Sequence, residues 1–385
     1  MKKLLALLLA VLMVVALAAC GESSEKKDDP TTAPATDAPA PAVAYSVAMI
    51  TDYGDITDQS FNQTTYEACK EFCDANGVDF KYYKPASDSD DDRIAMIEKA
   101  IDEDFNVIVM PGYAFAPAIA ATAPEYEDVT FIALDVSEYD LTSAGLETLP
   151  ANLYSAVYQE ELCGYMAGYA AVKLGYTKLG FLGGMAVPAV IRYGYGYVQG
   201  ADAAAAEIGA TVEMNYAYGN QFYGDADITA AMDTWYSNGT EIVFACGGAI
   251  FTSAAEAAAK VNGKVIGVDV DQAGIIDGTY GEGMTVTSAM KGLAPTVKTM
   301  LTAVSEGKFE GGKVENLGLI GEDPDANYVQ LPSASTQFAD GFTADNYKAL
   351  VADMFNGKIV VNNDITITAA DNAKTITVND QGNIK

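Results

Sequence analysis

Carboxylate, amide and aromatic side chains meet at one predicted turn near the start of the apolar pattern. Residues 46–52 predict a buried strand that ends in Asp52, and a helical pattern follows over about 60–75. Phe61 and Asn62 would then lie on the first helical turn, close to Asp52. A ring that can stack on a flat molecule, beside polar groups that can hydrogen-bond its edge, suits the binding of a small polar ligand. Taken alone, a phenylalanine such as Phe61 is more often a core residue than a stacking platform.

The same layout repeats downstream. Short apolar runs alternate with helical patterns, and the runs predict strands at 106–110, 129–135, 177–184, 211–219, 241–248 and 264–271. This alternation predicts an α/β fold with parallel sheets covered on both faces. Small or acidic residues end several of the runs, among them Asp135, Gly247, Gly248 and Asp269. Open α/β sheets bind ligands at that edge, so we expect a small-molecule cleft, although Gly and Asp also simply terminate strands.

The composition excludes several kinds of chemistry. The 385 residues include no histidine, which excludes serine–histidine and cysteine–histidine nucleophile pairs and histidine metal sites. Carboxylate pairs such as Asp52 and Asp135 leave an extracellular hydrolase open as an alternative, but acidic residues are so numerous that such pairs carry little weight. We therefore expect no enzymatic activity, no cofactor and no metal. A formal net charge of -31 repels phosphate backbones, which argues against nucleic-acid binding.

The first twenty residues have the layout of a secretory signal peptide. Lys2 and Lys3 precede an apolar core, and small residues lead into Cys20. This ending resembles the lipobox of bacterial lipoproteins, in which the chain is cut before the cysteine, and the cysteine carries acyl chains such as palmitate. We expect a signal peptide at 1–19, lipidation at Cys20, a disordered linker over 20–44 and a protein anchored at the extracytoplasmic face of the cell membrane. A plain signal peptide or an uncleaved anchor is the alternative.

Three segments together resemble a known family. They are an Asp, Gly, Asp pattern followed by Ser-Phe-Asn-Gln at 52–63, a Gly-Gly-Met pattern with Pro and Gly at 183–196, and Gly-Val-Asp-Val-Asp-Gln at 267–272. In this they resemble the basic membrane protein (BMP) family of bacterial lipoproteins, which are purine-nucleoside-binding components of ABC importers. The resemblance covers roughly residues 46–305 and thins out after about residue 310.

The resemblance implies a type I periplasmic-binding-protein fold, in which two doubly wound α/β lobes are joined by a hinge. The expected parts are an N-terminal lobe at 45–152 plus about 273–315, a C-terminal lobe at 153–272 plus about 316–360, and a tail of short strands at 361–385. The helix-rich stretch 154–175 would carry the chain into the second lobe. A monomer that delivers its ligand to an ABC permease is implied as well.

The resemblance also implies how a purine nucleoside would be held. Phe61 would stack on the base, and Phe222 is the first candidate for a second ring on the opposite lobe. The other expected ligand-binding residues are Asn62 and Asp135 at the base edge, Asp269 and Lys291 at the ribose hydroxyls, Asp52, and the Gly247–Gly248 backbone. Lys291 is expected at the start of a helix.

Several points stay open on the sequence. The same fold serves sugars and other small polar ligands, and a purely structural or adhesive role remains a minor alternative. Tyr193, Tyr195 and Tyr197 are expected to start a helix that packs around the hinge or cleft, and they leave the base preference open. Cys69 and Cys73 are expected to be buried apolar residues.

Overall fold

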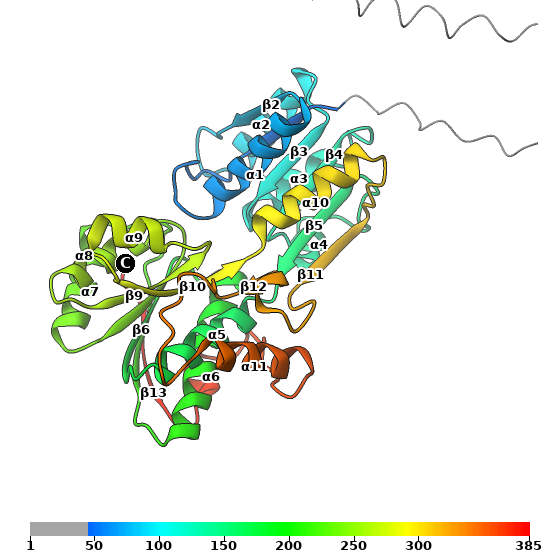
Figure 1. The fold of residues 1–385 in the computed structure, drawn as a ribbon. Helices are drawn as coiled ribbons and strands as arrows, with labels where there is room; N and C mark the ends of the chain where they lie inside the picture. The colour runs from blue at the N-terminus through cyan, green and yellow to red at the C-terminus, as the bar shows by residue number, and fades with distance from the viewer. Residues whose placement is uncertain (1–44) are drawn as a thin grey trace, which may run out of the picture. The chain divides into compact units, whose positions relative to one another are not determined.

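The computed structural model describes residues 45–385, which form two lobes, each built on one sheet with helices on both faces (Figure 1). The predicted signal peptide, Cys20 and the linker lie outside the described residues. Within residues 45–385, no helix is both long enough and apolar enough to cross a bilayer. The four cysteines of this part of the chain are buried and free, as predicted for Cys69 and Cys73.

The first lobe contains a six-stranded parallel sheet. Its strands in spatial order are β11 (Lys313–Leu317), β5 (Leu153–Tyr158), β4 (Thr130–Leu134), β3 (Val107–Pro111), β1 (Val47–Ile50) and β2 (Phe80–Tyr83). One face is covered by α1 (Phe61–Asn76) and α10 (Leu293–Ser305), the other by α2 (Asp90–Asp102), α3 (Ala116–Thr122) and α4 (Glu138–Ser143). Val47 and Met49 belong to the first core, and Ala48 and Ile50 to the second. Burial on both faces explains why the strand is continuously apolar.

The second lobe contains a seven-stranded sheet in which β12 alone runs antiparallel to its neighbour. Its strands in spatial order are β12 (Val329–Gln330), β10 (Thr285–Lys291), β9 (Lys264–Asp269), β8 (Ile242–Cys246), β6 (Lys178–Gly183), β7 (Glu213–Tyr218) and β13 (Thr377–Asn383). One face is covered by α5 (Glu160–Lys173), α6 (Pro188–Ile208) and α11 (Ala344–Phe355), the other by α7 (Ala226–Ser237), α8 (Phe251–Ala259) and α9 (Ala273–Tyr280). On β6, Phe181 belongs to the same core as Val47 and Met49, and Leu182 to a third core beneath α7 and α8, so this sheet is also buried on both faces.

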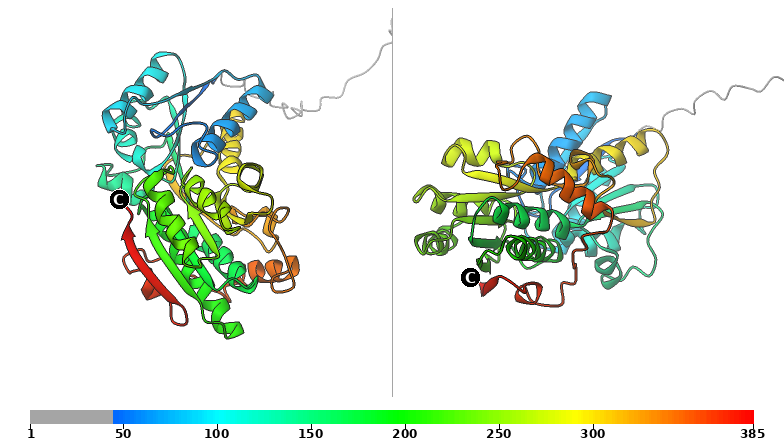
Figure 2. Two further views of the ribbon diagram at one scale, coloured as in Figure 1. Left: turned by 90° about the vertical axis from the view of Figure 1, so that its left-hand side faces the viewer. Right: turned by 60° about the horizontal axis from the view of Figure 1, so that its bottom comes forward.

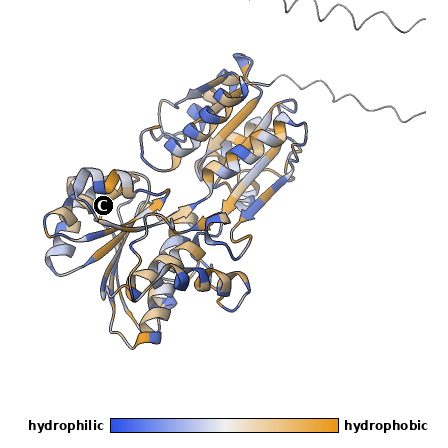
Figure 3. Ribbon diagram, in the orientation of Figure 1, coloured by the Kyte–Doolittle hydropathy of each residue, from blue (hydrophilic) through white to orange (hydrophobic). Residues whose placement is uncertain are grey.

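The edge strands differ from the central ones. The central strands of the first sheet are hydrophobic in Figure 3, whereas the edge strand β11 carries hydrophilic residues and is only partly buried. At the edge of the second sheet, β13 lies beside β7 (Figure 2), and nearly all of its residues are exposed. Short strands were expected in the tail, and β13 is one.

Within residues 45–385 the chain passes between the lobes three times, through Gln159, through Gly292 and through the segment 318–328. The backbone N–H of Gln159 donates to Leu317 O at 2.9 Å, and that of Gly292 donates to Tyr328 O at 2.7 Å. The three connections therefore lie side by side and are hydrogen-bonded to one another. Adjacent short connections of this kind allow two lobes to move as rigid bodies about a hinge.

Two of the lobe boundaries predicted from the sequence differ from the boundaries that strand pairing gives. The stretch 154–175 begins with β5, a strand of the first sheet, and the crossing to the second lobe comes after it. Tyr, Ala and Glu dominate this stretch, so its composition did not indicate a strand. Residues 273–291 form α9 and β10 of the second lobe, although they were expected in the first, because β10 pairs in parallel with β9 and buries its side chains there.

Candidate functional site

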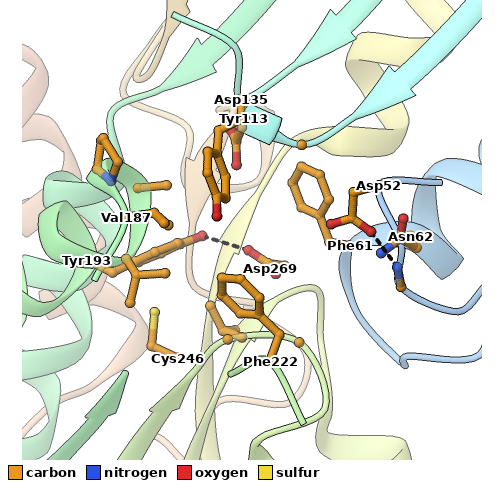
Figure 4. A pocket seen from close by; sticks show the side chains of 18 of the residues that line it. Asp52, Phe61, Asn62, Tyr113, Asp135, Val187, Tyr193, Phe222, Cys246 and Asp269 are labelled. Carbon is orange, nitrogen blue, oxygen red and sulfur yellow. Dashed lines mark hydrogen bonds between the residues drawn. The ribbon is translucent and has the colours of Figure 1, made fainter. Parts of the chain in front are cut away.

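A cavity of about 640 Å³ lies between the lobes, at the carboxyl ends of strands from both sheets (Figure 4). This is the edge at which the sequence predicts a cleft. All nine predicted ligand-binding residues line it, namely Asp52, Phe61, Asn62, Asp135, Phe222, Gly247, Gly248, Asp269 and Lys291. The size falls within the range of ordinary small-molecule pockets.

Asp52 and Asp58 shape the turn between β1 and α1. Asp52 Oδ1 accepts the backbone N–H groups of Tyr53 and Gly54, both at 2.7 Å. The carboxylate of Asp58 accepts from the backbone N–H of Asn62 at 2.9 Å, which caps the start of α1. Burial raises the pKa of Asp58, against the lowering effect of these hydrogen bonds. The turn fixes Phe61 and Asn62 at the cavity wall.

Asn62 is buried at 4% exposure, and half of its amide is unpaired. Its Nδ2 donates to Asp58 Oδ2 at 3.1 Å, whereas its Oδ1 has no hydrogen-bond partner among residues 45–385. Gly54 leaves room for this amide, because a Cβ there would come within 2.5 Å of Nδ2. A buried acceptor without a partner costs free energy, so a ligand that donates a hydrogen bond to Asn62 Oδ1 would bind more tightly.

Lys291 is the last residue of β10, not the start of a helix as predicted. Its side chain is 3% exposed, and Nζ lies 2.5 Å from Asp135 Oδ2, 3.5 Å from Glu160 Oε1 and 3.7 Å from Asp269 Oδ1. The ammonium also lies 4.8 Å from the centre of the Phe61 ring. Burial would lower the pKa of Lys291, but the carboxylates of Asp135, Asp269 and Glu160 raise it above its usual range. The lysine therefore stays charged and joins elements of both lobes.

Asp135 and Asp269 lie at the ends of β4 and β9, both with backbone φ in the left-handed region, at 60° and 64°. Asp269 accepts from Ser60 Oγ at 2.7 Å and from the hydroxyl of Tyr193 at 3.4 Å. The first of these bonds connects the two lobes across the cavity. Asp135 Oδ1 is buried and has no partner in the described part of the chain. Burial raises the pKa of Asp135 to about 6, with Lys291 acting in the opposite direction.

Phe222 follows β7 and lines the cavity from the second lobe. Its ring rests against glycines, because a Cβ on Gly184 would lie 2.5 Å from Phe222 Cδ1, and one on Gly247 would lie 3.1 Å from the same atom. Gly247 also has φ of 154°, which favours glycine. Gly184 and Gly247 thus make room for the ring, and Gly247 and Gly248 line the cavity.

Three further residues lie at the cavity or in its ion cluster, and the sequence did not identify them as part of the binding site. They are Glu160, Arg192 and Tyr193. Arg192 Nε donates to Glu160 Oε2 at 2.7 Å, and Glu160 is fully buried. The Tyr193 ring centre lies 5.7 Å from Lys291 Nζ, so this tyrosine packs at the cleft as expected, although α6 begins at Pro188 and not at the tyrosines. Among residues 45–385, no group of three or more His, Cys, Asp or Glu side chains is placed to hold a metal ion.

Glycines on α5 and α6 bring these residues to the cavity. A Cβ on Gly164 would lie 2.2 Å from Tyr193 O, and one on Gly196 would lie 2.1 Å from Glu161 O. Gly168 and Gly200 make the same kind of approach one turn further along each helix. The four-residue glycine spacing on both helices was the sequence signal for this close packing, and it allows Glu160 and Arg192 to meet.

Comparisons with known proteins agree with this architecture. Residues 45–340 match the Bmp family, described as ABC transporter substrate-binding protein PnrA-like. A Lactococcus lactis protein named ABC transporter nucleoside-binding protein BmpA is 26% identical, over 82% of this chain and 88% of its own length. A Listeria monocytogenes protein named CD4+ T-cell-stimulating antigen is 27% identical, over 82% of this chain and 87% of its own length.

Solved structures show the same fold. An ABC transporter solute-binding protein from Conexibacter woesei superposes with a TM-score of 0.64 at 23% identity, over 83% of this chain and 99% of that one. Another, from Aeropyrum pernix, gives a TM-score of 0.61 at 22% identity, over 83% of this chain and 88% of that one. These similarities confirm the predicted two-lobe periplasmic-binding-protein fold. The family match spans most of the chain, so this protein belongs to the BMP, or PnrA-like, family of ABC transporter substrate-binding proteins.

Proposed function

We propose that this protein is a lipid-anchored receptor outside the cytoplasm that binds a purine nucleoside between its lobes and delivers it to its permease. The observation that carries the proposal is the pairing of Phe61 and Phe222, one from each lobe, on a cavity that also holds Asp269 and Lys291. Rings on both sides suit a flat base, and stacking contributes roughly 1–3 kcal/mol per base. The relative named as nucleoside-binding supports the same ligand class.

The polar groups suit the other parts of a nucleoside. Asn62 Oδ1 and Asp135 Oδ1 are buried acceptors without a partner in the described chain, and they match donors on a base edge. Asp269 and Lys291 offer an acceptor and a donor for ribose hydroxyls. Hydrogen bonds to charged groups contribute about 1.5–3 kcal/mol each. With two stacked rings and the ordering costs of binding, a Kd of about 1 μM follows.

The charges around the cavity favour a neutral ligand. Asp52, Asp135, Glu160 and Asp269 outnumber Lys291 and Arg192 at the cavity or directly behind it. A phosphate group would meet this excess of carboxylates in a partly desolvated site. Nucleoside monophosphates should therefore bind far more weakly than nucleosides.

Mass spectrometry of the small molecule released when the purified protein is denatured is the direct test. Calorimetry with guanosine, adenosine, glucose and guanosine 5′-monophosphate on the ligand-free protein then ranks the classes. Micromolar binding of a nucleoside, with much weaker binding of the sugar and the monophosphate, is expected. Tight sugar binding without nucleoside binding would replace the proposal with a sugar receptor, and equal affinity for guanosine and its monophosphate would contradict the charge argument.

A further inference from the structure

The cavity continues beyond the groups that a plain nucleoside would use. Phe61 and Asn62 lie at one end, and Val187 lies at the other, with Asp269 between them in Figure 4. Lys291 Nζ is 4.8 Å from the Phe61 ring centre and 5.7 Å from that of Tyr193, so the ammonium lies between a first-lobe ring and a ring of α6. Val187 is the residue that precedes the first turn of α6. The far end is therefore next to the N-terminus of α6, the helix that carries Tyr193.

The second-lobe wall of this far end is mostly apolar, and the charged side chain that α6 contributes to it, Arg192, is paired with Glu160. The chain enters α6 without an acidic residue in the first turn, and proline occupies the start of the helix. The apolar residues that line the cavity there are Val187, Pro188, Ala189, Val190 and Ile365. The first lobe faces the cavity with Ser137, Tyr139 and Asp140. A ribose hydroxyl would find few partners on the α6 side, whereas an apolar group would be buried there.

Ile365 comes from the C-terminal segment, outside the residues 45–340 that match the family. That segment is fixed on α6 by side-chain hydrogen bonds. The Tyr195 hydroxyl donates to Ile367 O at 2.6 Å, and the Gln199 amide both donates to Asn362 O and accepts from Asn362 N, each at 2.8 Å. Further along, Asp202 Oδ1 accepts three successive backbone N–H groups over residues 374–376. Ile365 is thus held between two anchored points.

We propose that Ile365 and the start of α6 form a subsite for a small, uncharged, apolar substituent on the ligand. The proposal rests on the proposed function. If the base stacks on Phe61 and the ribose hydroxyls bind Asp269 and Lys291, the exocyclic 5′ carbon of the sugar is the part of a nucleoside directed toward Val187 and Ile365. The ligand class is therefore a nucleoside whose 5′ hydroxyl is replaced by an apolar group, as in 5′-deoxy-5′-methylthioadenosine.

Titration calorimetry with adenosine and with 5′-deoxy-5′-methylthioadenosine tests this on ligand-free protein. The natural protein should bind the methylthio compound at least about tenfold more tightly, since one apolar group in an apolar pocket changes affinity by that order. Ile365→Ala should remove most of this preference, and Ile365→Asp should reverse it, while each changes adenosine affinity less than about threefold. Val360→Asp is the matched control, because Val360 lies on the same segment, 84% exposed and away from the cavity lining.

The outcomes separate the two proposals. If these two compounds and guanosine all fail to bind, the nucleoside function fails, and if guanosine alone binds, the proposed 5′-methylthio ligand is wrong. If both bind equally to the natural protein, or if the Ile365 variants change both affinities alike while their thermal unfolding matches that of Val360→Asp, the subsite is wrong and the nucleoside function stands.

Discussion

Asp135 and Asp269 occupy equivalent places in the two lobes, and they are partnered very differently. Each follows a central strand, each has a left-handed φ, and each lies within 4 Å of Lys291 Nζ. Asp269 also accepts hydrogen bonds from Ser60 and Tyr193. Asp135 has no further partner for its buried Oδ1 among the described residues. The second lobe thus holds its aspartate in place and uses it to contact the first lobe, whereas the first lobe leaves an acceptor open for a ligand.

This difference gives separate tasks to two aspartates that occupy the same kind of position, at the end of a predicted strand. Lys291 is shared between them, so the balance of charge at the hinge depends on one buried ammonium. The predictions below test that balance, beginning with the largest expected effect.

Lys291→Met should destabilise the protein by roughly 3–5 kcal/mol, because Asp135, Glu160 and Asp269 lose their shared buried partner. Urea unfolding followed by circular dichroism measures the change. Adding Asp135→Asn to Lys291→Met should restore more stability than adding Asp269→Asn, since Asp269 keeps Ser60 and Tyr193.

Lys298→Met is the matched control for that experiment. Lys298 pairs with Glu71 at 2.7 Å, but both side chains are about half exposed or more, so the loss should stay below about 1 kcal/mol. If the two lysine substitutions changed stability equally, the ion cluster around Lys291 would not be shielded from water.

Asp269→Ala should weaken nucleoside binding by about 100-fold, and Asp135→Ala by about tenfold. Asp269 supplies both a charged acceptor for the ligand and the Ser60 bond that joins the lobes, whereas Asp135 supplies only one free oxygen. Calorimetry with guanosine compares the two variants, after thermal unfolding has shown that both are folded. An unchanged Kd for Asp269→Ala would remove that residue from the site.

Stability should depend on pH through Asp135 in a distinctive way. The pKa of this carboxyl is raised from 3.8 to about 6, so between pH 4 and pH 6 the folded protein keeps a proton that the unfolded chain has released. The contribution of Asp135 to the free energy of unfolding therefore falls as pH rises through this window, by on the order of 3 kcal/mol. Urea titrations at pH 4, 5, 6 and 7 compare the natural protein with Asp135→Asn. The free energy of unfolding of the natural protein should fall relative to that of the variant as pH rises. Parallel profiles would show that Asp135 titrates elsewhere.

Gly164→Ala should cost about 1–3 kcal/mol, because the new methyl would lie 2.2 Å from the carbonyl oxygen of Tyr193 and push α5 and α6 apart. The displacement should also loosen the Tyr193 contact with Asp269 and weaken nucleoside binding a few-fold. Gly278→Ala on α9 is the control, since no described heavy atom lies within 4 Å of its Cβ position, and it should be neutral or stabilising by about 0.4–1 kcal/mol. A similar loss in both variants would show that the close approach of α5 and α6 is not the cause of the effect at Gly164.

The sequence predicted the fold and the cavity lining well where the residues of one segment are enough to identify a strand and its end. The strand ends carrying Asp135 and Asp269 combine a continuous apolar run with a terminating small or acidic residue, and both signals are local. The turn before Phe61 is local in the same sense. These segments lie at the carboxyl edge of a parallel sheet, so the topology itself brought them to one cavity.

The parts that were missed depend on contacts that are distant in sequence. β5 lies in an Ala- and Tyr-rich stretch whose composition favours helix, and only its pairing with β4 and β11 makes it a strand. Lys291 ends a strand because β10 pairs with β9. The approach of Arg192 to Glu160 requires two glycine-bearing helices to touch, and no single segment shows which helix its partner will be.

The strand β13 has a consequence for how copies of this protein behave when they are crowded. Without it, β7 would be the open border of the sheet, offering unpaired backbone groups to any neighbouring chain. The chain instead covers that border with residues 377–383, and the strand now outermost is hydrophilic and almost wholly exposed to water. At this border, copies held close together on one surface would thus meet through solvated side chains rather than through an apolar strand.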